Sequence, residues 1–462
     1  MSKHLTIFWF RQDLRIADNP GLSAAALQGK VLPIYILDDE TRGEFKLGGA
    51  SRWWLHHSLN KLNQDLKNQL NLYIGDPKKI LSEIIKNHHV DAVYWNRCYE
   101  PWRIQQDSEI KSALKNMGIE CKSFNASLLW EPWQVLKSDG TPYKVYTPYY
   151  KNGCLQAPSP RAPLPKPKKL DLIKINDIQL NLLPKINWYQ TLESTWKVGE
   201  KAAHKKLDYF LEHYLLGYKK NRDYPAKPNT SRLSPHLHFG EISPQQIWHS
   251  VNHYDDDAQF LLRELAWREF SYYLLYHFPD LPRKNFQAKF DTFPWKNNKK
   301  LLTAWQQGKT GYPIIDAGMR ELWQTGYMHN RVRMIVASFL VKNLQIHWHK
   351  GEEWFWDCLV DADLANNSAS WQWVAGCGAD AAPYFRIFNP VIQGEKFDKD
   401  GDYTRRFVPE LAQLPNKYLF KPWMAPISVL NAAGIILGKT YPHPMVDLKQ
   451  TREDALLAYK RL

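Results

Sequence analysis

Short apolar runs alternate with helix-like stretches over the first third of the chain. The runs at residues 6–10 and 31–37 are typical of buried strands, and three further runs at 70–74, 92–95 and 121–124 continue the series. Helix-like stretches lie between and after them, at residues 18–28, 51–68, 79–87 and 105–116. Strands that alternate with helices of about 10–15 residues predict an α/β domain with a doubly wound parallel sheet.

The pattern becomes helical beyond about residue 200. Apolar positions recur at three- and four-residue spacing over residues 201–214, 258–276, 299–307, 314–324 and 330–342, and no second strand series follows. Between the two patterns, five prolines within residues 156–169 predict an extended connector. We therefore predict an α/β domain over residues 1–135, a connector over 136–200 and an all-α domain over 201–462.

Charge and tryptophan content are the two unusual features of the composition. The formal net charge is +14, and the chain has 20 Trp among 462 residues. A basic surface attracts polyanions such as nucleic acids, although a merely soluble basic protein would carry the same charge. Most tryptophans are expected in the core, but indoles also stack on bases and flavins.

Several classes of protein are excluded by what the sequence lacks. No run of about 18 apolar residues occurs, so no membrane contact is expected. The N-terminal stretch carries Arg11, Asp13 and Arg15 where a signal peptide would be apolar, which predicts a soluble, cytoplasmic protein. The five cysteines form no C-x-x-C pair, which argues against a disulfide framework, a zinc ribbon and an iron–sulfur cluster. The His pairs in 236–238 and 347–349 lack metal-ligand spacing with a carboxylate pair, so we expect surface or capping histidines and no metal site.

Two helical segments carry polar groups that packing explains poorly. Glu264, Trp267 and Arg268 fall at i, i+3 and i+4, so they share one helix face. An indole beside a carboxylate is suited to binding a nucleic-acid base, although a helix at the boundary of the core would show the same pattern. Asn330 and Met334, with Arg333, share another face and are typical either of core filling or of a pocket wall.

Residues 361–373 hold two carboxylates, two amides and two indoles in an otherwise apolar region. Buried polar groups need partners, and Arg333 is the candidate partner of Asp361. A structural salt bridge alone would not account for Asn366 and Asn367. Further upstream, Thr230-Ser231-Arg232-Leu233-Ser234 precedes a predicted helix, which indicates either a phosphate cradle or an ordinary N-cap.

Taken together, these segments resemble the photolyase/cryptochrome family, specifically its class I cyclobutane pyrimidine dimer (CPD) DNA photolyases. The resemblance runs through FRQDLR, TSRLSPHL, ELAWREF, GKTGYPIIDAGMRELWQTGYMHNRVRM and DADLANNSASWQWVAGCGADAAPYFRIFNPVIQGEKFD, in matching order. It implies an N-terminal antenna domain, a helical FAD-binding domain and light-dependent repair of CPDs in UV-damaged DNA by electron transfer from reduced FAD. It also implies a monomer.

The resemblance assigns roles to individual residues. The FAD-binding positions are Tyr218, Thr230, Ser231, Arg232, Leu233, Ser234, Arg268, Arg333, Asp361, Ala362, Asp363 and Asn367. Glu264, Asn330 and Met334 match residues that contact the dimer, while Trp371, Trp348 and Trp295 match the electron-transfer chain that photoreduces FAD. Trp267 and Trp373 match the indoles that flank the dimer, and Arg331, Arg386 and Gln393 match DNA-side positions.

Differences among relatives favour repair of CPDs. The (6-4) photolyases and animal-type cryptochromes carry His where Asn330 or Met334 lies, and plant-type cryptochromes usually place Asp at Asn367. A light-sensing cryptochrome is the second hypothesis, and a DNA-binding protein without repair activity the third. A second, antenna chromophore is expected, but Pro101-Trp102-Arg103 replaces the residue pair that folate-binding relatives have here. Folate held differently, deazaflavin, flavin and an empty site all remain open.

Overall fold

The computed structural model describes residues 4–251, 253, 255–381 and 385–462, and these fall into two compact units. Unit 1 comprises Met1–Leu215 and Ser231–Pro279, and unit 2 comprises Leu216–Thr230 and Asp280–Leu462. The chain therefore leaves unit 1, returns to it and leaves again. The helical segment 231–279 groups with the α/β region, whereas the predicted domain boundary lies at residue 200.

Unit 1 is built on a parallel sheet with the order β3-β2-β1-β4-β5, in which the short β6 also pairs with β2. The strands are β1 (Leu5–Phe10), β2 (Lys30–Leu37), β3 (Asn71–Ile74), β4 (Ala92–Asn96), β5 (Glu120–Phe124) and β6 (Asp171–Leu172). The crossover helices are α1 (Pro20–Gln28), α2 (Gly49–Asp65), α3 (Pro77–His88) and α4 (Pro101–Asn116). The predicted α/β fold and its first five strands are confirmed, whereas β6 lies inside the predicted connector.

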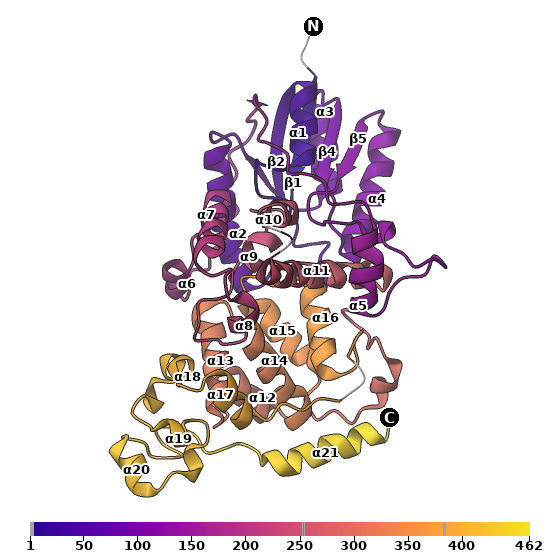
Figure 1. The fold of residues 1–462 in the computed structure, drawn as a ribbon. Helices are drawn as coiled ribbons and strands as arrows, with labels where there is room; N and C mark the ends of the chain where they lie inside the picture. Colours follow the sequence, from indigo (N-terminus) through magenta and orange to yellow (C-terminus); the bar gives the residue numbers. More distant parts are fainter. Residues whose placement is uncertain (1–3, 252, 254, 382–384) are drawn as a thin grey trace. The chain divides into compact units, whose positions relative to one another are not determined.

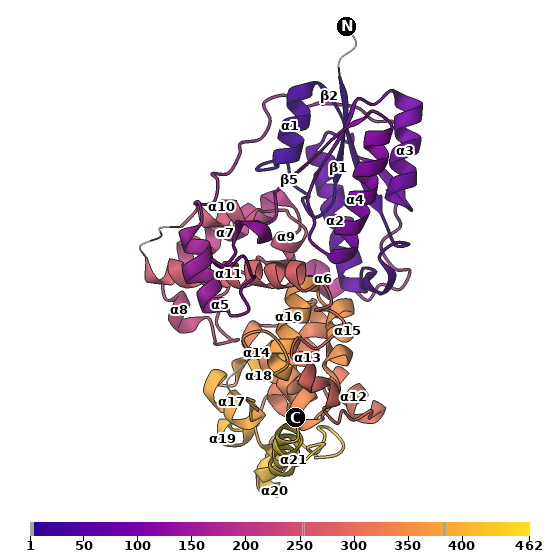
Figure 2. The same ribbon diagram turned by 90° about the vertical axis from the view of Figure 1, so that its right-hand side faces the viewer.

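The central strands β1, β2 and β4 are buried on both faces, which explains why they are continuous apolar runs, whereas the edge strands β3 and β5 are partly exposed. Figure 2 shows α1 on one face of the sheet and α3 with α4 on the other. The core on the latter side joins Ile7 and Val93 of the strands to Ile84 of α3 and Ile110 of α4. The strand order reverses between β1 and β4, and ligands of open α/β sheets bind beyond the carboxyl ends of the strands at such a point.

The rest of unit 1 is helical and contains one long helix, α11 (Asp256–His277). Asp255 caps it by accepting a hydrogen bond from Ala258 N at 2.8 Å. The other helices are η1 (Gly43–Phe45), η2 (Pro132–Gln134), α5 (Tyr146–Pro148), η3 (Tyr149–Gly153), η4 (Cys154–Gln156), α6 (Gln190–Thr195), α7 (Glu200–His213), α9 (Ser234–His238) and α10 (Pro244–Trp248).

Unit 2 is all-helical and is centred on α13 (Pro313–Thr325), α14 (Asn330–Ser338), α15 (Trp348–Cys358) and α16 (Leu364–Ala375). Figure 1 shows these four helices gathered in one bundle. The remaining elements are α8 (Tyr218–Asn221), η5 (Ala288–Thr292), α12 (Lys299–Gln306), η6 (Phe339–Asn343), α17 (Pro390–Phe397), α18 (Asp402–Phe407), η7 (Pro409–Leu411), α19 (Asn416–Leu419), η8 (Pro422–Met424), α20 (Ile427–Ala432) and α21 (Leu448–Lys460). The helix predicted over 330–342 continues past Ser338 in the wider π form, where the buried Lys342 side chain turns to donate to Arg386 O.

The described residues bear on three expectations about membrane helices, metal sites and histidines. No helix among them is long and apolar enough to span a bilayer. No group of three or more His, Cys, Asp or Glu among them could hold a metal ion. His347 caps α15 as predicted, but His236 is fully buried and lies 2.5 Å from Glu241, so the surface or capping reading is wrong for His236.

Candidate functional site

The first turn of α14 presents the predicted dimer contacts of unit 2. Asn330 begins the helix and is exposed, and Met334 lies one turn later and is half-buried. Arg331, between them, donates to Asp223 Oδ2 at 2.7 Å and lies 3.9 Å from the Met334 sulfur. An amide and a thioether therefore share one edge of the helix, as the i, i+4 spacing predicts.

Arg333 of the same helix is fixed by two independent contacts. Its Nε donates to Met328 O at 2.8 Å, and its Nη2 donates to both carboxylate oxygens of Asp361 at 3.0 and 2.8 Å. The Asp361 side chain is only 4% exposed, and this carboxylate contributes to raising the pKa of Arg333. The ion pair predicted between these two residues is confirmed.

The start of α16 carries the other polar groups of this segment. Asp363 caps the helix by accepting from Asn366 N at 2.9 Å, and the Asn366 amide nitrogen donates to the same carboxylate oxygen at 2.7 Å. Asn367 is buried, and its Nδ2 donates to Glu352 O of α15 at 3.1 Å. This bond orients the amide so that Oδ1 is left as a hydrogen-bond acceptor. Ala362, beside these residues, is buried in the core.

Of the three predicted electron-transfer tryptophans of unit 2, two are buried and the third is partly exposed. Trp371 and Trp348 are 2% and 0% exposed, and Trp295 is half-buried. The His347 ring lies 5.5 Å from Trp348 and 5.0 Å from Trp295, so it links the two indoles. An added Cβ on Gly351, one turn after Trp348, would lie 2.0 Å from Trp371. Only glycine therefore allows α15 to approach this indole so closely.

The long helix α11 of unit 1 carries the predicted Glu264 and Trp267 three residues apart, both half-buried. The Trp267 indole stacks on Tyr146 with ring centroids 3.7 Å apart and an interplanar angle of 8°. The hydroxyl of Tyr146 donates to Arg263 O at 2.8 Å, which holds the phenol ring in place. Sequence reasoning missed Tyr146 because it lies in the predicted connector; its one signal is the tyrosine-rich stretch YKVYTPYY.

Arg268 of α11 contacts the protein itself. Its Nη1 donates to Ser127 O at 2.9 Å and to Glu269 Oε1 at 3.0 Å, and its guanidinium lies 4.7 Å from the Tyr272 ring centre. Glu269 also accepts from Leu129 N at 2.7 Å. Through these contacts Arg268 joins α11 to the segment around Ser127, and its assignment to cofactor binding stays a prediction.

Glu269 predicts a pH dependence of stability. The side chain is 1% exposed, and burial raises its pKa from 4.5 to about 7. Between these values the folded protein holds a proton that the unfolded chain releases, so the contribution of Glu269 to stability falls as the pH rises. The expected loss is about 3 kcal/mol over this window, at about 1.4 kcal/mol per pH unit. The unfolding midpoint of the wild type should therefore fall relative to that of Glu269→Gln when the pH is raised from 5 to 8. A constant difference between the two proteins would contradict this.

The predicted phosphate segment is divided between the units, because Tyr218 and Thr230 belong to unit 2 and residues 231–234 to unit 1. Tyr218 is buried. Ser231 Oγ accepts weakly from Leu233 N at 3.4 Å, and Ser234 begins α9. Arg232 has a φ of +51°, and its guanidinium lies 5.0 Å from the Trp196 ring centre. A polar turn ahead of a short helix is therefore present.

The predicted DNA-side residues of unit 2 lie at or near its surface. Trp373 is half-buried, and its Nε1 donates to Asp380 O at 3.1 Å. Arg386 is exposed, and Gln393 is half-buried on α17. The motif stretch 382–384 between them lies outside the described residues.

A second polar cluster in unit 1 was not predicted from the sequence. The guanidinium groups of Arg42 and Arg103 lie 5.5 and 4.5 Å from the Trp102 ring centre. Arg103 Nε and Glu100 Oε2 form an ion pair at 3.7 Å, whereas Arg42 Nε, Trp102 Nε1 and Gln106 Oε1 are buried without a hydrogen-bond partner among the described residues. The cluster follows β4, near the point where the strand order reverses. Unpaired buried polar groups at this place indicate a ligand site.

Comparison with known proteins identifies the family. A model described as "DNA photolyase" matches residues 6–168, and one described as "FAD binding domain of DNA photolyase" matches residues 260–461. A deoxyribodipyrimidine photo-lyase of Agrobacterium fabrum is 50% identical over 98% of this chain and 97% of its own length. The chain belongs to the photolyase/cryptochrome family. Cryptochrome-1 of Arabidopsis thaliana is 37% identical over 97% of the chain and 69% of its own length.

Solved structures agree with this assignment. A bacterial class III photolyase from Agrobacterium tumefaciens has a TM-score of 0.96 and 48% identity, covering 100% of this chain and 98% of that one. An archaeal photolyase from Sulfolobus tokodaii, described with two FAD molecules, has a TM-score of 0.83 and 31% identity over 99% of this chain and 100% of that one. The chain thus carries the FAD-binding domain of a photolyase, and a second chromophore of unspecified type is consistent with these relatives.

The residues of unit 2 fit FAD. The ion pair of Arg333 with Asp361 neutralises a carboxylate beside the site, and the Asn367 Oδ1 left as an acceptor suits a ring N–H of the reduced flavin.

Proposed function

We propose that this chain is a DNA photolyase that splits cyclobutane pyrimidine dimers in light. The observation that carries the proposal is the first turn of α14 in unit 2, where Asn330 and Met334 share one edge. In unit 1, Glu264 and the stacked Trp267 lie three residues apart on α11. A carboxyl, an amide, a thioether and an indole are suited to the polar edge and the faces of a pyrimidine dimer. The net charge of +14 favours binding to the DNA backbone.

The chemistry that FAD supplies when bound is light-driven donation of an electron to the dimer and its later recovery. The protein then has the tasks of positioning and electrostatics. As a carboxylic acid, Glu264 donates a hydrogen bond to the dimer carbonyl and so stabilises the negative charge that develops there. The Asn367 amide oxygen is placed to accept a hydrogen bond from a ring N–H of the reduced flavin. Trp267 and Trp373 stack against the dimer.

The class within the family is a separate proposal. The class I assignment from sequence motifs stays a prediction, whereas the 48% identity to a class III photolyase favours class III. Cyclobutane dimers are the proposed substrate in either case.

A photoreceptor function is the alternative, and the match to Cryptochrome-1 favours it. The chain covers about two thirds of the length of that protein. Asn330, Met334 and Glu264 argue for repair, because a light sensor has no need to bind a dimer.

The second chromophore is proposed to bind at the cluster around Trp102. The indole offers a stacking face to two guanidinium groups, and three buried polar atoms of the cluster (Arg42 Nε, Trp102 Nε1 and Gln106 Oε1) have no partner among the described residues. An aromatic chromophore with acceptor groups would satisfy the arginines and stack on the indole.

Repair is tested with an oligonucleotide that contains one thymine cyclobutane dimer. The reduced, FAD-loaded protein is incubated with it in blue light and in darkness, and a (6-4) lesion is tested in parallel. We expect the cyclobutane dimer alone to be restored, and only in light. A flavin-loaded protein that binds DNA and repairs neither lesion would instead support the photoreceptor.

Glu264→Ala is the matched variant for this assay. We expect it to keep FAD and to repair with a lower quantum yield, because the developing charge loses one hydrogen bond. Arg263→Ala, at the exposed neighbouring position, serves as the control. An undiminished quantum yield in Glu264→Ala would remove this carboxyl from the mechanism.

A further inference from the structure

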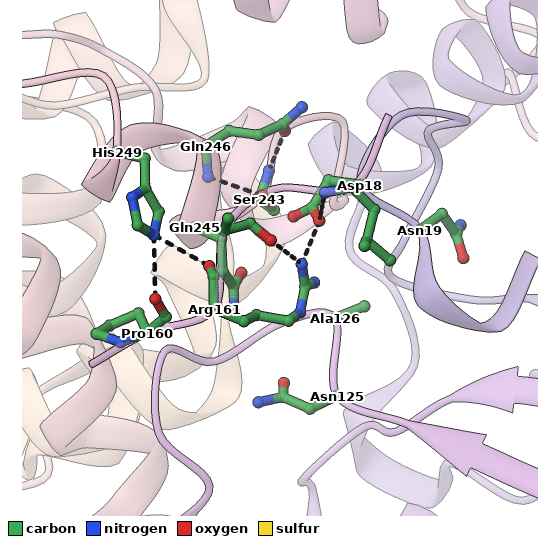
Figure 3. Close-up of polar contacts among 12 residues, drawn as sticks. Asp18, Asn19, Asn125, Ala126, Pro160, Arg161, Ser243, Gln245, Gln246 and His249 are labelled. Carbon is green, nitrogen blue, oxygen red and sulfur yellow. Dashed lines mark hydrogen bonds and ion pairs between the residues drawn. The ribbon is translucent and has the colours of Figure 1, made fainter. Parts of the chain in front are cut away.

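A buried lysine without a carboxylate partner lies in unit 2, in the π-helical turn η6. Lys342 is 3% exposed, and no carboxylate among the described residues pairs with it. By contrast, the half-buried Arg161 of unit 1 pairs with the fully buried Asp18 (Figure 3). Burial lowers the pKa of Lys342 from 10.5 to about 7. A leucine or methionine would cost less at this position, so a lysine here indicates a specific polar contact.

The contact is a hydrogen bond from Lys342 Nζ to the main-chain oxygen of Arg386. Ser338, four residues before Lys342 at the end of α14, makes a second contact of this kind: its Oγ accepts from Phe388 N at 3.1 Å. Two side chains of one helical stretch therefore bind the main chain of segment 385–388 at residues that lie two apart. The π form of η6 agrees with a special task, because such turns within α-helices are frequent at functional sites.

Aromatic packing holds the start of the same segment. The Phe385 ring stacks on Tyr459 of α21, with ring centroids 4.5 Å apart and an interplanar angle of 3°. Lys342 Nζ lies 4.6 Å from the Phe385 ring centre. An added Cβ on Gly376, after α16, would lie 3.0 Å from the same ring. The main chain that carries Arg386 is thus fixed by contacts with several elements of unit 2.

The side chain of Arg386 contrasts with its fixed main chain. Arg386 is exposed, and its guanidinium forms no hydrogen bond or ion pair with the described residues. A guanidinium binds phosphate oxygens well, and phosphate contacts fix the register of a protein on DNA. A free cation on a fixed main chain is therefore suited to contact the DNA backbone at a defined place.

We propose that Lys342 is a positioning residue, which holds segment 385–388 so that Arg386 contacts a phosphate of the bound DNA. This inference rests on the proposed repair function. Because Lys342 is buried, it acts through the main chain of the segment and does not itself touch the DNA. Ser338 has the same task at the second contact.

The test is binding of the full-length, FAD-loaded protein to a labelled oligonucleotide with one thymine cyclobutane dimer, in darkness, at pH 8 and at several salt concentrations. At this pH Lys342 is largely uncharged, so Lys342→Met removes almost no charge. We expect this variant to bind about tenfold more weakly. The slope of log affinity against log salt should decrease in magnitude by about one, because one phosphate contact is lost. The FAD content and the repair yield of the bound dimer should not change.

A double variant shows whether Lys342 acts through Arg386. Arg386→Ala should change the affinity and the salt slope as Lys342→Met does, and the double variant should bind no more weakly than Arg386→Ala alone. Lys350→Met is the matched control, because Lys350 of α15 is exposed and pairs with Glu353. It should bind within about twofold of the wild type. Additive losses in the double variant would refute the proposed role of Lys342.

Ser338→Ala is the second variant, for the case that Lys342→Met does not fold. It removes the acceptor of Phe388 N and should lower the affinity and the salt slope in the same direction. Wild-type affinity and slope in Lys342→Met or in Arg386→Ala would refute this inference, as would the same result in Ser338→Ala where it stands in for Lys342→Met. A wild-type protein that binds the oligonucleotide but repairs no dimer would instead count against the proposed function.

Discussion

Arg333→Met is expected to cost unit 2 about 3–5 kcal/mol of stability and to release most of the FAD. Asp361 is 4% exposed, and both of its oxygens accept from the Arg333 guanidinium, so the substitution leaves a buried carboxylate without its cation. The same change removes the donor to Met328 O. A loss of only about 1.4 kcal/mol in binding already lowers the affinity for FAD tenfold. The measurements are the FAD-to-protein ratio after purification and the unfolding midpoint of the apoprotein.

Arg331→Met is the matched control, two residues away on the same helix. Arg331 pairs with Asp223, whose side chain is 40% exposed, and exposed ion pairs contribute about 0–1 kcal/mol. It should therefore keep its FAD and nearly all of its stability. The FAD content and stability of Arg333→Lys should lie between those of the two Met variants, because a lysine keeps the charge but not the guanidinium geometry. Full FAD content in Arg333→Met would refute a role for the ion pair in holding the cofactor.

The elements that the sequence predicts well are those in which the local pattern and the final environment agree. Strands β1, β2 and β4 are buried on both faces, so their residues form unbroken apolar runs, and their ends fall within one residue of the prediction. The polar face of α14 follows from helical spacing alone. The pairing of Arg333 with Asp361 spans 28 residues, yet it follows because a buried carboxylate needs a cation.

Features that depend on distant packing were not predictable. Tyr146, in the predicted connector, stacks on Trp267 of α11, and no periodic pattern in the sequence marks this contact. The cluster around Trp102 arises where a parallel sheet reverses its strand order, which is a property of topology. Strand β6 is only two residues long, too short for a strand pattern in a proline-rich stretch. The split of residues 218–234 between two units depends on the same kind of long-range packing.

Trp371→Phe is expected to abolish nearly all photoreduction of oxidised FAD, while repair by chemically reduced enzyme is kept. The indole is 2% exposed, and α15 approaches it at Gly351, so it occupies a fixed position inside unit 2. Phenylalanine fills most of the space but is much harder to oxidise than indole. Trp348, fully buried, and Trp295, half-buried and linked to it through His347, continue the series towards the surface. The measurement is the decay of oxidised flavin absorbance under blue light with an external reductant.

Trp305→Phe is the control that distinguishes a loss of electron transfer from a change of packing around Trp371. The Trp305 ring contacts Trp371 edge-on at 6.3 Å and is fully buried, but it lies outside the assigned chain. This variant should therefore photoreduce like wild type. Trp295→Phe should be slowed, because an oxidised inner indole would recover its electron from the flavin before the external reductant could supply one. Equal loss in Trp305→Phe and Trp371→Phe would assign the effect to packing. Wild-type photoreduction in Trp371→Phe would contradict the predicted chain and would require a different route for the electron.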